Sequence, residues 1–224
     1  MVGVETSAYF CCMIRRFLAC LTFFLLLAAR ASAQSPNEQG LAKEVEEPSS
    51  VWEPHGYLKT NAVGWGMLIS NIAFEIDLSP GWSLAVPIYY SALNYFRSTV
   101  KFRTAAVQPE IRYWLRSDTY VGAHFSIAHY NYALGGDLRR QDHDGSTPAW
   151  GGGISGGFRK RLGHSGRWFL ECTAGVGVYK LYYDKFINQT GGAEVGSTKK
   201  TFFCVDNVAV TFSYRFNLRK KDKE

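Results

Sequence analysis

The sequence predicts an all-β fold, namely an eight-stranded antiparallel up-and-down transmembrane β-barrel whose lumen is packed with polar side chains. Three observations lead to this prediction. The chain contains eight segments in which apolar residues alternate with polar residues or glycine. The connections between them are short and long in turn, and tryptophans lie beside both kinds. Because successive side chains of a strand point to opposite faces, each segment would turn an apolar face to lipid and a polar face to the lumen.

The first 33 residues have the features of a cleaved secretory signal peptide. A pair of arginines at 15–16 precedes an apolar run over residues 17–29, and Ala31-Ser32-Ala33 has the small residues of a cleavage site. The run is shorter than the roughly 20 apolar residues that a membrane-spanning helix needs. Met13, just before the arginine pair, is an alternative start to Met1. The sequence therefore predicts an exported protein.

The remaining chain has the composition of an exported β protein. The whole sequence is 224 residues long, with a formal net charge of +6 and 15% aromatic residues. The charge excess is too small to indicate a nucleic-acid partner in an exported protein. Three of the five cysteines leave with the signal peptide, so Cys172 and Cys204 remain. Their predicted positions at opposite ends of the barrel exceed disulfide reach, so two unpaired thiols are expected.

Two polar segments flank the predicted barrel of residues 56–218. Residues 34–55 contain Pro, Ser, Gln and a charge cluster without periodicity, which predicts a flexible periplasmic linker. Residues 219–224 form a basic tail. Because an even number of strands brings both ends to the same side of the membrane, the tail is also expected in the periplasm.

The first four predicted strands differ in clarity. The first, residues 57–65, alternates least well, whereas residues 72–78 and 82–91 alternate throughout. The fourth strand, residues 104–115, contains Pro109, which cannot donate a hydrogen bond to the ladder. A β-bulge is therefore predicted at this proline.

The last four predicted strands cover residues 120–130, 150–162, 168–179 and 201–216. The final strand is the clearest, with one apolar face made of Val208, Val210, Phe212, Tyr214 and Phe216. These nine alternating residues match the roughly 9–11 residues that a tilted strand needs to cross a bilayer.

The connections predict which end of the barrel faces outward. Tight turns near residues 80, 117 and 165 alternate with longer polar connections over residues 96–103, 134–148 and 185–200. Outer-membrane barrels have short periplasmic turns and longer outer loops. Tryptophans beside both kinds of connection predict aromatic girdles at the two membrane interfaces, formed by Trp65, Trp82, Trp114, Trp150 and Trp168.

Charged residues on the polar faces predict a network inside the lumen. Its expected members are Lys59, Glu75, Asp77, Glu110, Arg112, Arg159, Arg161 and Glu171. The tight turn near residue 165 would bring Arg159 opposite Glu171. A packed salt-bridge plug is favoured over a gated ion path, because the lumen of eight strands is only wide enough to be filled by side chains.

Other candidate sites are weaker. His124 and Ser126 share one face of the fifth strand and could form part of a lipid deacylase, but the sequence offers no third catalytic member. Asp137, Asp142, His143 and Asp144 could bind a divalent cation, yet they lack the spacing of a calcium loop. No catalytic residue, metal or cofactor is therefore assigned.

Three stretches resemble a known family: Leu58-Lys59-Thr60-Asn61, Gly81-Trp82-Ser83-Leu84, and Gln108-Pro109-Glu110-Ile111-Arg112-Tyr113-Trp114-Leu115. The family is a Bacteroides-type group of small outer-membrane β-barrels catalogued as a domain of unknown function, and some members are encoded beside fimbria genes. The resemblance implies a fold and a location in the cell outer membrane, but no catalytic or ligand-binding residues.

The expected function is that of an outer-membrane structural or adhesive scaffold rather than an enzyme. Its expected partners are outer-membrane lipid and lipopolysaccharide, the outer-membrane assembly machinery, and fimbrial or other envelope proteins. A lipid A-modifying hydrolase using His124 and Ser126 is the first alternative, and a narrow channel is the second.

Overall fold

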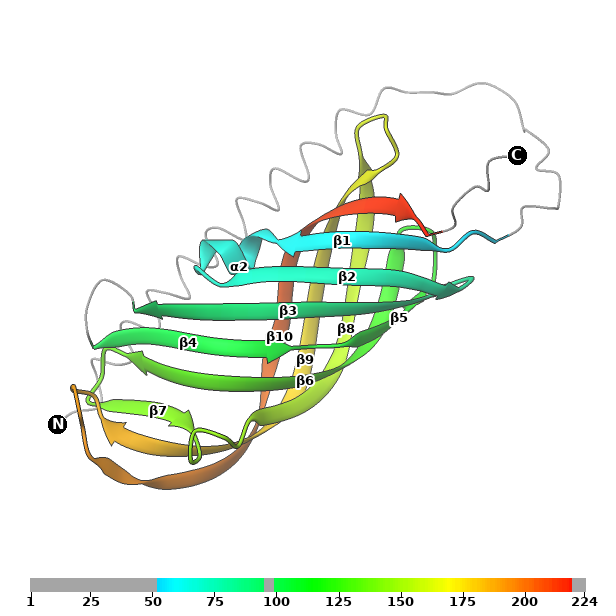
Figure 1. Ribbon diagram of the computed structural model, residues 1–224. Helices are drawn as coiled ribbons and strands as arrows, with labels where there is room; N and C mark the ends of the chain where they lie inside the picture. The colour runs from blue at the N-terminus through cyan, green and yellow to red at the C-terminus, as the bar shows by residue number, and fades with distance from the viewer. Residues whose placement is uncertain (1–51, 95–98, 219–224) are drawn as a thin grey trace, which may run out of the picture. The chain divides into compact units, whose positions relative to one another are not determined.

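The computed structural model of the chain describes residues 52–94 and 99–218. The predicted signal peptide, most of the predicted linker and the basic tail lie outside the described residues. The elements are β1 (His55–Asn61), α2 (Ala62–Gly66), β2 (Ser70–Ser79), β3 (Trp82–Asn94), β4 (Val100–Val107), β5 (Glu110–Trp114), β6 (Thr119–Leu134), β7 (Leu138–Asp142), β8 (Ala149–Leu162), β9 (Trp168–Ile187) and β10 (Glu194–Asn217) (Figure 1). No helix within this part of the chain is long and apolar enough to cross a membrane.

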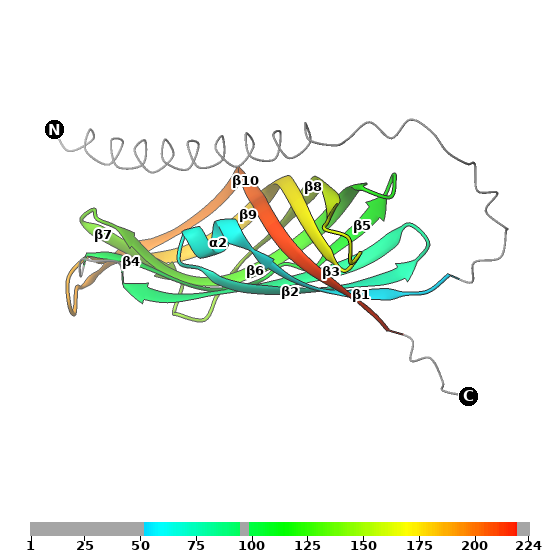
Figure 2. The same cartoon turned by 90° about the horizontal axis from the view of Figure 1, so that it is seen from above.

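The strands form one ten-stranded antiparallel sheet whose hydrogen bonds run in a closed ring through eight strands (Figures 1 and 2). The ring follows chain order from β1 to β10, with β4 and β5 sharing one position and β7 lying outside it. It closes where β1 pairs with β10, from His55 opposite Asn217 to Asn61 opposite Thr211. The predicted all-β class and antiparallel order are confirmed, although the shared position and the additional strand depart from a regular eight-stranded arrangement.

Side chains alternate across the sheet as the sequence predicts. On β2, Phe74 points outward and is 51% exposed, whereas the adjacent Glu75 points inward and is 1% exposed. On β10, Phe212 is exposed and Ser213 is fully buried. Most of the buried side chains in the described residues are polar or charged. The ring therefore has a polar interior and an apolar outer surface.

The first strand is shorter than predicted. β1 ends at Asn61, and the expected continuation through Trp65 is the single-turn helix α2. Asn61 caps this helix, since its side chain accepts a hydrogen bond from the Val63 amide at 3.0 Å. On the β2 side, where the backbone pairing ends at Lys59, the Asn71 side chain bonds both the amide and the carbonyl of Asn61, at 2.6 and 3.0 Å. Two asparagines thus end the strand.

The predicted bulge at Pro109 is wrong. Val107 pairs with Ile88 of β3, and Glu110 pairs with Ala85 of the same strand. The same number of residues separates these pairs on both strands, so no extra residue is inserted. The proline interrupts the strand between β4 and β5 but leaves its register unchanged.

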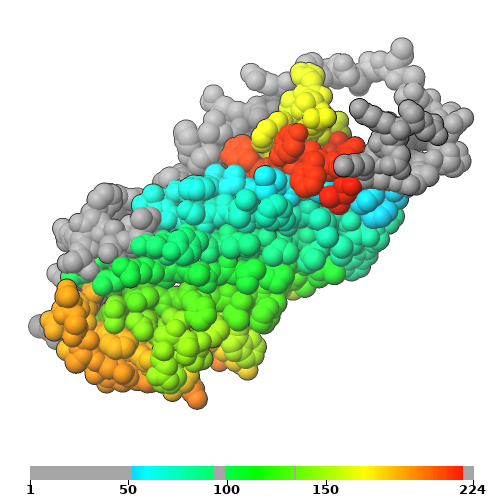
Figure 3. Space-filling model, viewed as in Figure 1, coloured from blue at the N-terminus to red at the C-terminus, as the bar shows by residue number. Residues whose placement is uncertain are grey.

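All three predicted long loops are partly strand, since β4 already begins at Val100 within the first of them. β9 and β10 continue past the ring as a long hairpin, and β7 pairs with both β6 and β9. We call residues 129–147 and 181–201 the distal extension. It lies at the opposite end of the ring from the tight turn at residues 163–166 (Figures 1 and 3). The side of the ring that carries the distal extension is therefore much taller than the opposite side.

Candidate functional site

Six charged side chains meet inside the ring, at the end away from the distal extension. They come from β1, β2, β5, β8 and β9 and are all buried, and they include three cations and three carboxylates: Lys59, Glu75, Glu110, Arg112, Arg159 and Glu171. The formal charges balance. We call these residues the ion-pair cluster.

Glu171 is the centre of the ion-pair cluster. Its carboxylate accepts hydrogen bonds from Lys59 Nζ at 2.9 Å, from Arg112 Nη1 at 2.8 Å and from Arg159 Nη2 at 2.9 Å. Glu75 accepts from the same two arginines, at 3.0 and 2.7 Å, and also contacts Lys59. Each of these cations therefore bridges the same two carboxylates across the interior.

Aromatic rings and Glu110 complete the cluster. Arg112 donates two hydrogen bonds to Glu110, at 2.8 and 2.6 Å, and lies 4.3 Å from the centre of the Tyr120 ring. Arg159 lies over the Trp114 ring at 4.4 Å. Such contacts stabilise a desolvated guanidinium. The cluster fills this end of the interior with groups that satisfy one another.

Three predicted site residues lie elsewhere than expected. Asp77 pairs with His55 Nδ1 at 3.4 Å instead of joining the cluster. Arg161 is exposed near the end of β8, next to the tight turn at 163–166. Trp114, expected in a membrane girdle, points inward and donates a hydrogen bond from Nε1 to Ser83 at 3.0 Å.

The other four girdle tryptophans are exposed on the outer surface. Three of them, Trp82, Trp150 and Trp168, lie on strands of the ring, whereas Trp65 lies on α2. The sequence pattern therefore identified exposed aromatic residues at both ends of the strands, apart from the inward-facing Trp114.

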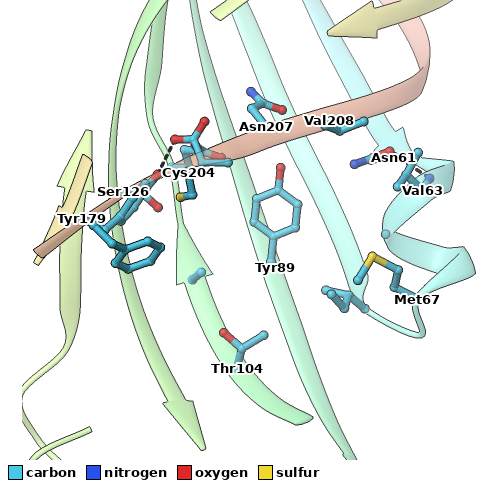
Figure 4. A pocket seen from close by; sticks show the side chains of 16 residues that line it. Asn61, Val63, Met67, Tyr89, Thr104, Ser126, Tyr179, Cys204, Asn207 and Val208 are labelled. Carbon is cyan, nitrogen blue, oxygen red and sulfur yellow. Dashed lines mark hydrogen bonds between the residues drawn. The ribbon is translucent and has the colours of Figure 1, made fainter. Parts of the chain in front are cut away.

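A cavity of about 350 Å³ occupies the half of the interior nearer the distal extension (Figure 4). Its lining comes from α2 and the residues after it, and from strands β3, β4, β6, β9 and β10. Apolar side chains such as Met67, Ile69 and Phe202 supply one part, and Tyr89 and Tyr179 add hydroxyl groups. Ligand sites are typically concave, mostly apolar and of this size, with a few placed polar groups.

Asp206 is the acidic residue among the described residues that line this cavity. Its Oδ2 lies 2.6 Å from His124 Nε2 and accepts a hydrogen bond from the Tyr179 hydroxyl at 2.6 Å. The Asp206 side chain is 5% exposed and that of His124 is 0% exposed. Within the described residues, neither Asp206 Oδ1 nor His124 Nδ1 has a hydrogen-bond partner. Buried polar atoms without partners are uncommon and mark possible ligand contacts.

A β-bulge directs Asp206 inward. The register between β9 and β10 shifts between Val205 and Asn207, so Asp206 is the extra residue. On β9, where Gly177 pairs with Cys204, a Cβ on Gly177 would collide with Oδ2 of Asp206. Bulges commonly redirect a side chain near a functional site. The last strand alternates strictly only from Val208 onward. The sequence prediction therefore misses Asp206, and the break in alternation before Val208 is the signal that could have found it.

Ser126 lines the same cavity but does not form a catalytic relay with His124. His124 Nε2 bonds Asp206, and its other ring nitrogen has no partner among the described residues. A serine nucleophile would need a hydrogen bond to that ring. The structure thus supplies the carboxylate that the sequence lacked, but it does not assemble the Ser–His–Asp arrangement.

In the distal extension, Asp184 ties together three segments. It accepts hydrogen bonds from His143 Nδ1 at 2.7 Å, from the Asp144 amide at 2.9 Å and from Ser197 Oγ at 2.8 Å. Ligand atoms of His143, Asp144 and Asp184 lie within 4.8 Å of one another, close enough to share a cation. Asp142 pairs with His129 instead. With Asp184 satisfied by these hydrogen bonds, its evident role is structural.

The loop held by Asp184 is expected to loosen in acid. The hydrogen bond from His143 lowers the pKa of Asp184 below its usual value of 3.8. A carboxylate with a lowered pKa stabilises the fold above its unfolded-state pKa and loses that contribution as the pH falls through the folded-state value. Amide exchange at Asp144, corrected for the intrinsic rate, should stay slow down to about pH 4 and rise below it. Asp184→Asn should remove this step, and an unchanged pH dependence would contradict the assignment.

The chain matches the family described as "Protein of unknown function (DUF3575)" over residues 40–216. It belongs to this family. The matched residues include the ion-pair cluster, the cavity and the distal extension, so all three are features of the DUF3575 region. No curated protein and no solved structure matches the chain.

The described DUF3575 region contains two cysteines, and both are free, as the sequence predicted. Cys204 lines the cavity beside Asp206, whereas Cys172 is not among the lining residues. Because the two thiols differ in this way, Cys204 can report on the cavity.

Proposed function

We propose that this DUF3575 protein is an outer-membrane β-barrel that serves as a structural or adhesive scaffold for an envelope or fimbrial partner. The observation that carries the proposal is the inverted distribution of side chains. Large apolar residues cover the outer surface, such as Ile154 at 66% exposure, and charged residues are buried inside. Monomeric soluble proteins rarely expose continuous apolar surface, whereas a membrane barrel presents such a surface to lipid.

The ion-pair cluster, which fills one end of the interior, favours a scaffold role rather than a narrow channel. The ion-pair cluster bridges the interior from several sides and leaves its charges neutralised. An ion crossing the barrel would have to separate buried pairs such as Arg159 and Glu171, which is costly. Eight strands also enclose an interior that is only wide enough to be filled by side chains or to hold one small ligand.

The distal extension supports a contact surface outside the membrane. In this orientation it is on the cell-surface side, and the tight turns are periplasmic. It carries several basic residues, suited to the phosphates of lipopolysaccharide or to an acidic partner: Arg139, Arg140, Lys185, Lys199 and Lys200. Delivery would use the predicted signal peptide and the outer-membrane assembly machinery.

A pair of epitope tags tests this topology. One tag is inserted after Gly191, at the tip of the β9–β10 hairpin, and the other after Gly163, in the tight turn. Antibody should stain intact cells that carry the first tag, and should reach the second only after permeabilisation. The purified protein should also run faster on a gel before heating than after it. Equal access to both tags, or recovery in the soluble fraction, would contradict the proposal.

Lipid A mass spectrometry separates the scaffold from the hydrolase. Outer membranes with and without the gene should give the same lipid A species, since Ser126 is not hydrogen-bonded to His124. Loss or gain of an acyl chain that depends on Ser126 would favour the hydrolase instead.

A further inference from the structure

The wall of the ring changes character beside the cavity. β1 ends at Asn61 and β2 begins at Ser70, so α2 and the residues after it replace strand at this height. β10 pairs with β1 only from Thr211 onward, and α2 contacts β10 and lines the cavity together with residues 206–208 of β10. The cavity is thus bounded on one side by Val63 and Met67 rather than by a hydrogen-bonded strand (Figure 4).

This part of the wall is apolar on its outer side as well. Trp65 and Leu68 are exposed on α2 and the turn after it, and Phe203 and Val205 are exposed on β10. Met67 is exposed and also lines the cavity. A ligand with an apolar body would therefore meet apolar side chains both at the wall and inside it.

The inner part of the cavity offers an acidic group. Asp206 Oδ1 is buried and has no partner among the described residues, although Oδ2 is bonded by both His124 and Tyr179. The described residues that line the cavity include no lysine or arginine. A donor seated against Oδ1 would satisfy it, and a positively charged donor would form the stronger hydrogen bond.

We propose that this cavity is a binding site for a small amphipathic amine. The ammonium group would bond Asp206, and the apolar body would pack against Met67, Ile69 and Phe202. The site requires the bulge that turns Asp206 inward, and it does not depend on the scaffold role or on any chemistry at Ser126. The barrel would then carry a recognition site as well as an outer surface.

Three probes with the same apolar body test the head-group preference. Phenethylamine, phenethyl alcohol and phenylacetate are titrated into the purified full-length protein in maltoside micelles, with binding followed by calorimetry. Phenethylamine is expected to bind, and the alcohol and the carboxylate to bind at least about ten-fold more weakly, because only the amine makes a charged hydrogen bond to Asp206. Equal affinity for all three would overturn the proposal.

Matched substitutions locate the site. Asp206→Asn should weaken phenethylamine binding by about 10- to 100-fold. Asp137→Asn removes an exposed carboxylate of the distal extension and should leave the affinity unchanged. Ala106→Leu, which places a larger side chain in the cavity, should also weaken binding. Unchanged affinity in Asp206→Asn would overturn the proposal.

A labelling experiment decides the matter even if Asp206→Asn fails to fold. In a Cys172→Ser background, Cys204 is the reactive thiol of the described region, and iodoacetamide reaches it through the cavity. Phenethylamine should slow its alkylation several-fold, and phenylacetate should not. Alkylation at the same rate with and without phenethylamine would mean that the amine does not occupy the cavity, which would overturn the proposal.

Discussion

Arg159→Leu is expected to lower the free energy of unfolding by about 3–5 kcal/mol, the usual cost of removing one partner from a buried ion pair. Arg159 bonds Glu75 and Glu171 and stacks on Trp114, so its loss leaves two buried carboxylates with fewer partners. The measurement is urea unfolding of the protein in lipid vesicles, read from the gel shift between folded and heated forms.

Two further variants separate charge balance from packing. Arg161→Leu makes the same change two residues along β8 at an exposed position, and should alter stability by less than about 0.5 kcal/mol. Adding Glu171→Gln to Arg159→Leu restores equal numbers of buried cations and carboxylates in the cluster. The double variant should therefore lose less stability than the sum of the two single changes. Equal effects of Arg159→Leu and Arg161→Leu would show that the cluster is not a stabilising plug.

If the outer surface faces lipid as proposed, Phe74→Arg should destabilise the protein in a bilayer by about 2–4 kcal/mol, the cost of an arginine on a lipid-facing position near the membrane centre. Phe74 lies in the middle of β2 and points outward. The measurement is again urea unfolding in vesicles, together with the amount of protein recovered in the outer-membrane fraction.

Val195→Arg is the matched control for lipid contact. Val195 is 61% exposed, more than Phe74, but it lies on the distal extension beyond the proposed membrane region. The substitution should therefore change neither stability nor recovery. If both substitutions are tolerated equally, the apolar outer surface does not face lipid, and the membrane assignment is wrong.

The periodic part of the fold could be predicted from the sequence. Successive side chains of a strand point to opposite faces, so once one residue of a regular segment is placed, all the others follow. In this way the sequence identifies Phe74 as outward-facing and Glu75 as inward-facing. It also brought Arg159 opposite Glu171, as the structure has them. These inferences need only local sequence and short turns.

Features that depend on distant partners could not be predicted in this way. The end of β1 at Asn61 depends on the side chain of Asn71, which bonds the backbone of Asn61. Asp206 is aimed at the cavity by a register shift against β9, which is visible only once the strands are paired. The proposed ligand-binding cavity therefore lies where the alternation of apolar and polar residues on β10 is broken.

Closure of the ring by its first and last strands has a consequence for biogenesis. Seven residue pairs join β1 to β10, and the partner of β1 is at the C-terminal end of the described chain. Until residues 211–217 have been synthesised, β1 has no neighbour on that side, and an unpaired strand edge invites association with other chains. Closure of the ring must therefore wait for the last strand of the chain.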